Sequence, residues 1–272
     1  MERLEQAITG RRVVALAAPA GWGKTTALTQ WSNVATLPIA WYTLDGGDSD
    51  PSVFLDYLLH SIAAFIPDGD DLITRLSTAP ASELPQLYQA TALGVAAAPA
   101  PFALVLDDFH ALGDDASANG LALINGFLAS IAEYAPNCHL VVASRTPPAL
   151  YGMVRLIAQQ RAAVFDYTAL QFSPHDVQRL AGISPGLMLS DTSAQHLTNQ
   201  LGGWVTGIVL SLDKVRAQST ADDHFNNQFG ERDSQQPQQP MIEADTGRVY
   251  AFLAEQVIAP LPVGLQRFLE DT

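Results

Sequence analysis

The stretch that decides the fold is "ALAAPAGWGKTTALTQW", from Ala15 to Trp31. An apolar run ends here, the chain turns through two glycines, a lysine follows, and a helical pattern begins. Successive backbone N–H groups in such a turn form an anion-binding nest, and the helix that follows adds its positive N-terminal end. The stretch therefore predicts a phosphate-binding loop between a strand and a helix.

One position departs from the usual pattern of such loops, GxxxxGK[ST]. Ala18 stands where the first glycine belongs. An alanine is tolerated there if its φ is negative and its methyl group points away from the phosphates. In the loop, Lys24 would supply a cation to the β- and γ-phosphates, and the Thr25 hydroxyl would ligate Mg²⁺. The alternative is a strand–turn–helix joint that contains Gly-Lys-Thr by chance, and the strand-like and helical flanks favour the nucleotide loop.

A pair of carboxylates follows another apolar run, "FALVLDDFH". We expect Asp107 to hold Mg²⁺ through water, as an acidic residue at the end of a neighbouring strand does. Asp108 could then orient or deprotonate the water that attacks the γ-phosphate. Adjacent carboxylates repel each other unless a cation neutralises them, and a metal ion accounts for both. The alternative is a solvated pair of loop carboxylates.

Arg145 ends a further apolar run, "HLVVASR". If this run is a strand beside the Asp107 strand, the guanidinium lies near the terminal phosphate and can report whether ATP or ADP is bound. An arginine after a strand is common by itself. The order of Gly-Lys-Thr, Asp-Asp and strand-Arg, each in matching context, is what makes the set specific for a nucleotide site.

Composition excludes several classes of function. The 272 residues are 48% hydrophobic and 15% charged, which is typical of a globular protein, and the net charge is −14. Because nucleic-acid binding depends on Lys and Arg neutralising phosphates, the chain by itself is a poor candidate for DNA binding. The single cysteine, Cys138, is predicted to be a buried structural thiol in a reducing compartment. No signal-peptide or membrane-helix pattern occurs, so we expect a soluble cytoplasmic protein with no membrane partner.

Five short apolar runs alternate with longer helical patterns in the first part of the chain. Because the runs are continuous rather than alternating, they predict strands covered on both faces, and hence an α/β fold with a parallel sheet between helices. Asp50 is the expected N-cap of one such helix, with Pro51 at its first position. The expected apolar face of this helix is Val53, Phe54, Tyr57, Leu58 and Ile62. The predicted strands are Val13–Ala17, Ile39–Leu44, Phe102–Asp108, His139–Ser144 and Ala163–Tyr167.

After Tyr167 the pattern becomes entirely helical, and Ser173 with Asp176 is expected to form a variant of the capping box. From Ser219 the chain is rich in Gln, Asn, Asp and Pro, which predicts a mobile linker. A final helical pair is expected to begin a further domain. The predicted domains are a nucleotide-binding domain over 1–168, a helical domain over 169–218, a flexible Gln/Pro-rich linker over 219–246, and the start of the further domain over 247–272.

Several motifs together resemble the ATPase module of MalT-like regulators, the large LuxR-type transcription activators within the STAND class of signal-transduction ATPases. The resemblance covers nearly the whole chain outside the linker, and in that family the first loop glycine is commonly alanine. It implies a three-layer P-loop NTPase fold, a helical domain and a winged-helix domain that together enclose ATP, the last truncated here. The motifs include "LAAPAGWGKTTALTQW", "LVLDDFHAL", "VVASRTPP", "LQFSPHDVQRL", "LGGWVTGIVLSL" and "YAFLAEQVIAPLPVGLQRFLEDT".

The resemblance also implies a function. Members of the family are switches that are ADP-bound and closed at rest, and that bind ATP and self-associate when an inducer binds a sensor domain. Slow Mg²⁺-dependent hydrolysis resets the switch. We therefore expect an inducer and a sensor domain in the parent chain, and DNA binding only through a C-terminal helix-turn-helix outside this chain.

Carried over by position, the resemblance implies roles for individual residues. The base is expected to pack on Val205, which follows Gly203-Trp204 where the family usually has a proline. Mg²⁺ would be held by Thr25 and Asp107. The expected catalytic residues are Lys24, Asp108 and Arg145, and the nucleotide-binding loop is Ala20, Gly21, Trp22, Gly23, Lys24, Thr25 and Thr26.

Two other functions remain open at this point. The first is an interaction scaffold that does not hydrolyse ATP and has a vestigial site, which Val205 in place of the proline slightly favours. The second is a small-molecule kinase, which would need a lid with catalytic arginines. After Tyr167 the chain offers few of them, Arg179 being the clearest.

Overall fold

The computed structural model describes residues 2–113, 118–183, 187–229 and 244–259, and the chain divides into two compact units. Unit 1 comprises residues 1–19 and 24–169. Unit 2 comprises residues 20–23 and 170–272. Each unit has a hydrophobic core of its own.

Unit 1 is built on a sheet of five parallel strands in the order β2-β3-β4-β1-β5. Every residue of β1 and β3 is buried, as the continuous apolar runs predict for strands covered on both faces. All five predicted strands are present, with ends shifted by at most one residue. Their bounds are β1 Val13–Ala17, β2 Ile39–Thr43, β3 Phe102–Asp107, β4 Cys138–Ser144 and β5 Ala162–Asp166.

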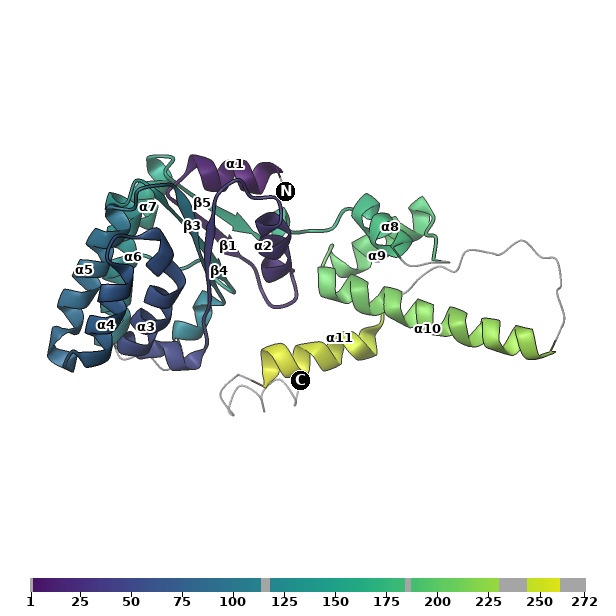
Figure 1. Cartoon of the computed structure of the whole chain (residues 1–272). Coiled ribbons are helices and arrows are strands. Elements are labelled where there is room, and N and C mark those ends of the chain that lie inside the picture. The colour runs from purple at the N-terminus through teal and green to yellow at the C-terminus, as the bar shows by residue number, and fades with distance from the viewer. Residues whose placement is uncertain (1, 114–117, 184–186, 230–243, 260–272) are drawn as a thin grey trace. The chain divides into compact units, whose positions relative to one another are not determined.

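Helices cover both faces of this sheet, so the predicted three-layer α/β/α fold is confirmed. Helices α3 to α6 lie on one face and α1 and α2 on the other (Figure 1). The first group shares one core with the sheet, and α7 contributes to the same core. This placement is what right-handed crossovers between parallel strands require. The bounds are α1 Glu2–Gly10, α2 Lys24–Ser32, α3 Pro51–Ile62, α4 Gly69–Thr78, α5 Leu84–Ala96, α6 Ala118–Tyr134 and α7 Met153–Ala158.

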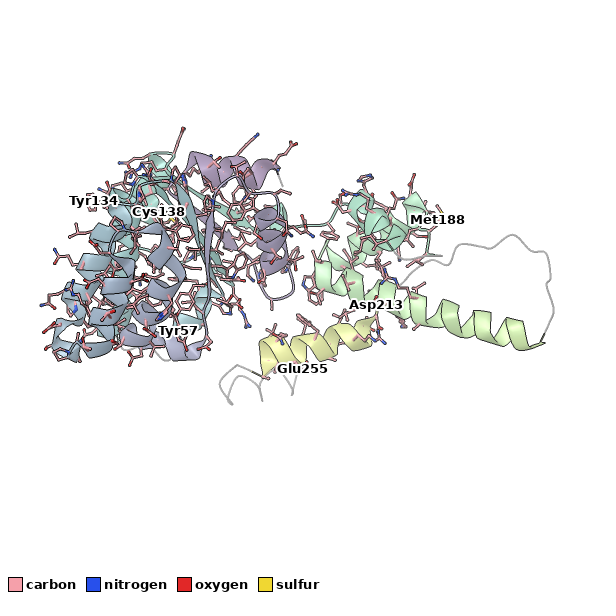
Figure 2. The ribbon with its side chains drawn as sticks, in the orientation of Figure 1. Tyr57, Tyr134, Cys138, Met188, Asp213 and Glu255 are labelled. Carbon is pink, nitrogen blue, oxygen red and sulfur yellow. The ribbon has the colours of Figure 1, made fainter. Side chains whose placement is uncertain are left out.

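Helix α3 begins as predicted, but its buried face differs from the predicted one. The Asp50 carboxylate accepts a hydrogen bond from the Ser52 N–H at 2.7 Å, which fixes the N-terminus. Val53 and Tyr57, which the apolar pattern placed in the core, are 37% and 57% exposed; Figure 2 labels Tyr57. The buried face of α3 is turned slightly about the helix axis from the predicted one. It consists of Phe54, Leu55, Leu58, Leu59 and Ile62.

The single cysteine is a buried core residue, as predicted. Cys138 is the first residue of β4 and its thiol is free and buried (Figure 2). Burial raises the pKa of the thiol to about 12. The thiolate, which is the reactive form, is therefore disfavoured at neutral pH.

Unit 2 is helical. The N-terminus of its first helix has the expected capping box: the Asp176 N–H donates to Ser173 Oγ at 3.2 Å, and the Ser173 N–H donates to Asp176 Oδ2 at 3.0 Å. The core of the unit is formed mainly by Val177, Leu197, Ile208 and Leu212. The helices are α8 Pro174–Gly182, α9 Asp191–Leu201, α10 Val205–Phe229 and α11 Thr246–Leu253, and a π-helical turn, Ala254–Ile258, follows.

The predicted linker differs from the structure in its first part. Helix α10 continues to Phe229, past Gln218, where the sequence pattern loses its apolar residues. The segment from Ser219 to Phe229 contains no proline or glycine, so nothing in it breaks a helix that has already begun. The rest of the linker up to residue 243 lies outside the described residues.

The last predicted segment is described only in part. Helix α11 begins at Thr246, close to the predicted start of the further domain. Residues 260–272, which include the whole of the second predicted helix (262–272), lie outside the described residues. In the described part of the chain no helix is long and apolar enough to span a membrane.

Two glycines of unit 1 give opposite predictions for stability. A Cβ on Gly69 would lie 2.5 Å from the Ala63 carbonyl oxygen, whereas a Cβ on Gly126, within α6, would meet nothing within 4 Å. We expect Gly69→Ala to lower the free energy of unfolding by about 1–3 kcal/mol through this overlap. The matched variant Gly126→Ala should raise it by about 0.5–1 kcal/mol, because alanine restricts the unfolded chain. Urea unfolding of both variants checks this, and equal effects would contradict it.

Candidate functional site

The loop between β1 and α2 has the backbone that an anion-binding nest needs. Gly21 has φ +75° and Gly23 has φ +79°, which glycine adopts without strain. The φ of Ala18 is not positive and the residue is fully buried, so an alanine fits the place of the usual first glycine. The backbone part of the condition set by the sequence, a φ that is not positive, is therefore met at Ala18.

Lys24 is the first residue of α2, and its side chain folds back along the loop. The residue is 7% exposed, and its Nζ donates to the Ala18 carbonyl at 2.7 Å and to the Pro19 carbonyl at 3.2 Å. Burial lowers the pKa of the ammonium group, the charge of Asp108 opposes this shift, and the charge of Arg145 adds to it. The ammonium group is thus held within electrostatic range of both other predicted catalytic residues.

Asp107 ends β3 and is completely buried. Its Oδ1 accepts a hydrogen bond from the Asp108 N–H at 3.0 Å, while its Oδ2 has no hydrogen-bond partner among the described residues. Burial raises the pKa of the carboxyl group, and hydrogen bonding by the nearby Thr25 hydroxyl opposes that shift. A buried carboxylate oxygen without a partner beside a threonine hydroxyl fits an Mg²⁺ site, because both are oxygen ligands.

The protein alone offers few ligands to such a metal ion. Among the residues that the structure describes, no group of three or more His, Cys, Asp or Glu side chains could hold a metal. Mg²⁺ commonly keeps several waters and is bound through one or two protein oxygens together with the phosphates of a nucleotide. Thr25 and Asp107 together would provide two protein oxygens, which matches this way of binding Mg²⁺.

Asp108 lies in a different environment from its neighbour. Its φ is +53°, an uncommon conformation for a residue other than glycine. Its side chain is 45% exposed, and its Oδ1 lies 3.9 Å from Nδ1 of His110. One carboxylate is therefore buried and the other is reachable by water, which suits two separate roles.

Arg145 follows the last residue of β4, and β4 pairs with β3 in parallel, with Val142 opposite Leu106. The neighbouring strands expected for Asp107 and Arg145 are therefore present. Since the carboxyl ends of parallel strands lie along one edge of a sheet, both residues flank the same edge. Arg145 is partly buried.

The remaining predicted loop residues differ in exposure. Thr25 and Thr26 are exposed in the first turn of α2, where a hydroxyl can reach a ligand at the helix N-terminus. Trp22 is partly buried.

Unit 2 contains the tip of the loop, Ala20 to Gly23. Residues that were not among the predicted site residues form hydrogen bonds to this tip. Trp204 Nε1 donates to the Ala20 carbonyl at 3.2 Å, and the Thr206 N–H and hydroxyl donate to the Gly21 carbonyl at 3.1 and 2.8 Å. Val205 lies between them in sequence, with a methyl group 3.9 Å from where a Cβ on Gly23 would be. The sequence signal that could have identified these residues is the "GGW" motif directly before α10.

The buried Asp107 carboxyl predicts a gain in stability when it is replaced. Its pKa is raised above the ordinary value of 3.8, so the native protein binds a proton that the unfolded chain releases, and stability falls as the pH rises through that window. Without nucleotide and at neutral pH, the free energy of unfolding of the Asp107→Asn chain should therefore be about 1–2 kcal/mol higher than that of the native chain. Thermal unfolding as a function of pH measures this. A variant less stable than the native chain at neutral pH would contradict the assignment.

Comparisons with known proteins find related sequences. The chain is 26% identical over 217 residues to the HTH-type transcriptional regulator MalT of Cronobacter sakazakii, which covers 77% of the chain and 23% of the regulator. It is also 26% identical over 279 residues to the serine/threonine-protein kinase PknK of Mycobacterium tuberculosis, covering 95% of the chain and 22% of the kinase. The chain thus spans less than a quarter of the length of these curated relatives. No family model matches it.

A solved structure supports the fold. The STAND protein with a tetratricopeptide repeat sensor from Pyrococcus horikoshii superposes with a TM-score of 0.56 at 16% identity, covering 96% of this chain and 32% of that one. Together with the MalT matches, this confirms the resemblance to MalT-like P-loop modules of the STAND class.

Proposed function

We propose that this MalT-like P-loop module of the STAND class is a cytoplasmic switch that binds ATP and ADP and hydrolyses ATP slowly. The observation that carries the proposal is the pairing of a confined lysine with a buried, unpartnered carboxylate oxygen. Lys24 is held at 2.7 Å from the Ala18 carbonyl, and Oδ2 of Asp107 has no partner among the described residues. A phosphate chain with its metal ion would satisfy both groups.

In this proposal the residues have separate tasks. The nest at Gly21 and Gly23 would donate backbone N–H groups to the phosphates, and Lys24 would neutralise the β- and γ-phosphates. Mg²⁺ would be held by the Thr25 hydroxyl and by Asp107, and would supply charge neutralisation at the phosphate oxygens. The exposed carboxylate of Asp108 would orient the attacking water, and Arg145 would stabilise charge on the terminal phosphate.

Val205 is the one residue predicted to contact the adenine base. Val205 is at the start of α10, and its methyl groups approach Gly23 in unit 2. We propose that the valine offers the base an apolar contact in place of the usual proline. A valine side chain can pack against an aromatic face, although it lacks the rigid ring of proline.

The role of the whole protein follows from its relatives as a proposal. The matching regulator is named for transcriptional control, and the matching solved structure carries a repeat sensor. We propose that the parent chain joins this module to a sensor for an inducer, self-associates in the ATP-bound state, and contacts DNA through a separate domain. The net charge of −14 supports leaving DNA contacts to another part of the parent chain.

Release of phosphate from ATP tests the hydrolytic part of the proposal. The purified chain with ATP and Mg²⁺ should release phosphate slowly, faster than the Lys24→Ala chain, and chelation of the metal should reduce the rate to that background. Equal release from the two chains, with nucleotide binding intact, would instead support the non-hydrolysing scaffold.

A further inference from the structure

A second hollow in unit 1 is lined by basic side chains. It has a volume of about 390 Å³, and its lining residues are Thr9, Gly10, Arg11, Arg12, Pro136, His139 and Arg161. Thr9 and Gly10 end α1, and the other residues lie at or just before the amino-terminal ends of β4, β1 and β5, which are neighbours in the sheet. Cys138, labelled in Figure 2, begins β4 at this end. The phosphate loop follows the carboxyl end of β1, so the hollow lies at the opposite edge of the sheet.

The concentration of positive charge here is unusual for this protein. The chain has 14 Lys and Arg against 28 Asp and Glu, yet three arginines and a histidine line this one hollow. Glu133 is the acid that pairs with the group, through Arg161 at 3.3 Å. Arg11 and Arg12 form no ion pair with any acidic residue in the described part of the chain.

Two of the three arginines also have a structural task. Arg12 Nη1 donates to the Ala135 carbonyl at 3.2 Å, and Arg161 Nη2 donates to the Glu133 carbonyl at 3.0 Å. These contacts satisfy carbonyls at the end of α6, where a positive charge is favourable. A guanidinium group has five N–H donors, and Arg12 uses only those of Nη1, so it keeps donors for a ligand. Both Nη groups of Arg161 are already engaged by Glu133, Gln159 and Ala132, so this arginine contributes mainly its charge.

Of the other two basic residues, only Arg11 has no such contact from its side chain within the described part of the chain. The guanidinium group of Arg11 makes no hydrogen bond or ion pair with any residue that the structure describes. The ring of His139 is oriented by its Nδ1, which lies 2.8 Å from the Arg11 carbonyl oxygen, and this leaves Nε2 for another partner. A core or capping role therefore explains Arg12 and Arg161 but leaves Arg11 unexplained.

We propose that this hollow binds a small molecule that carries a phosphate monoester or another compact dianion. The two positive charges without acidic partners match a dianion, and arginine forks pair with oxyanions through two parallel hydrogen bonds. The volume falls within the roughly 300–1,000 Å³ of typical small-molecule sites, so it admits an organic body as well as the anionic group. This site is separate from the nucleotide loop and does not depend on it.

Calorimetric titration of the Lys24→Ala chain tests the proposal, because that substitution weakens anion binding at the phosphate loop. The probes are inorganic phosphate and glycerol 3-phosphate. Both should bind saturably, and glycerol 3-phosphate should bind more tightly if the hollow also holds the organic body. Adding Arg11→Ala should weaken binding roughly tenfold or more, since a charge-assisted hydrogen bond is lost. Arg75→Ala, which removes the same charge from an exposed position on α4, should leave the affinity unchanged.

A second variant blocks the hollow without changing its charge. A Cβ on Gly10 would meet nothing within 4 Å, so Gly10→Leu adds a side chain in the open space at the wall of the hollow. Binding of both probes should be lost while the circular dichroism spectrum is kept. Absence of binding by the folded Lys24→Ala chain would overturn the proposal, and so would equal affinities of the Arg11→Ala and Arg75→Ala chains.

Discussion

Lys24→Ala is expected to weaken the binding of both ATP and ADP by at least about 100-fold, because it removes a charge-assisted contact to the phosphates worth about 3 kcal/mol. The lysine is already held within the loop by carbonyl contacts at 2.7 and 3.2 Å. Little further ordering of the side chain is therefore needed when phosphates bind, and most of the contact energy should appear as affinity. Fluorescence titration with a labelled nucleotide measures the loss.

The chain supplies a matched control for this experiment. Its only other lysine is Lys214, on α10, with a side chain that is 46% exposed and lies 3.9 Å from Asp245. Lys214→Ala makes the same chemical change far from the phosphate loop in sequence, and its affinity should equal that of the native chain. If the two variants lose affinity equally, net charge and not the loop governs binding, and the assignment of Lys24 is wrong.

Asp108→Asn is expected to slow phosphate release by about 10²–10⁴-fold while nucleotide affinity changes little. The side chain is reachable by water and adjoins the buried metal ligand, so it is placed to act on the attacking water. Asparagine suits the test better than alanine because Asp108 has φ +53°, a conformation that asparagine tolerates. Single-turnover hydrolysis together with equilibrium binding separates the effect on chemistry from any effect on affinity.

Asp68 is the matched control for this substitution. It also has a positive φ, +56°, it precedes α4, and it is exposed. Asp68→Asn should leave the hydrolysis rate unchanged. A rate for Asp108→Asn equal to that of the Asp68→Asn chain would remove Asp108 from the catalytic step.

The parts of the fold predicted well from sequence are those with local causes. The buried strands appeared as continuous apolar runs because both faces of the sheet are covered. The phosphate loop was recognisable because glycine, lysine and threonine are each required by backbone geometry or by chemistry at one position. Asp107 and Arg145 could be placed at the same sheet edge from the sequence because β3 and β4, which are consecutive in the chain, are neighbours in the sheet.

Other features depend on tertiary packing and were not predictable in the same way. Tyr57 fits the helical period of α3 but lies at its edge, because neighbouring elements decide which side of a wide stripe is buried. Helix α10 continues beyond the last turn that has an apolar face. Composition alone does not mark a helix end in a segment without proline or glycine. The hydrogen bonds from Trp204 and Thr206 to the loop tip join residues more than 180 positions apart.

The basic hollow was also not predictable from the sequence. The four basic residues lie at or just before the starts of three separate strands, and only the strand order brings them together: Arg11, Arg12, His139 and Arg161. No short motif marks such a site.

The central claim is that the chain binds adenine nucleotides, and calorimetric titration of the purified chain with ATP and with ADP, in the presence of Mg²⁺, tests it most directly. The account predicts saturable binding of both nucleotides at a single site, lost in the Lys24→Ala chain and kept in the Lys214→Ala chain. Absence of binding by either nucleotide at millimolar concentration to a folded native chain would contradict it.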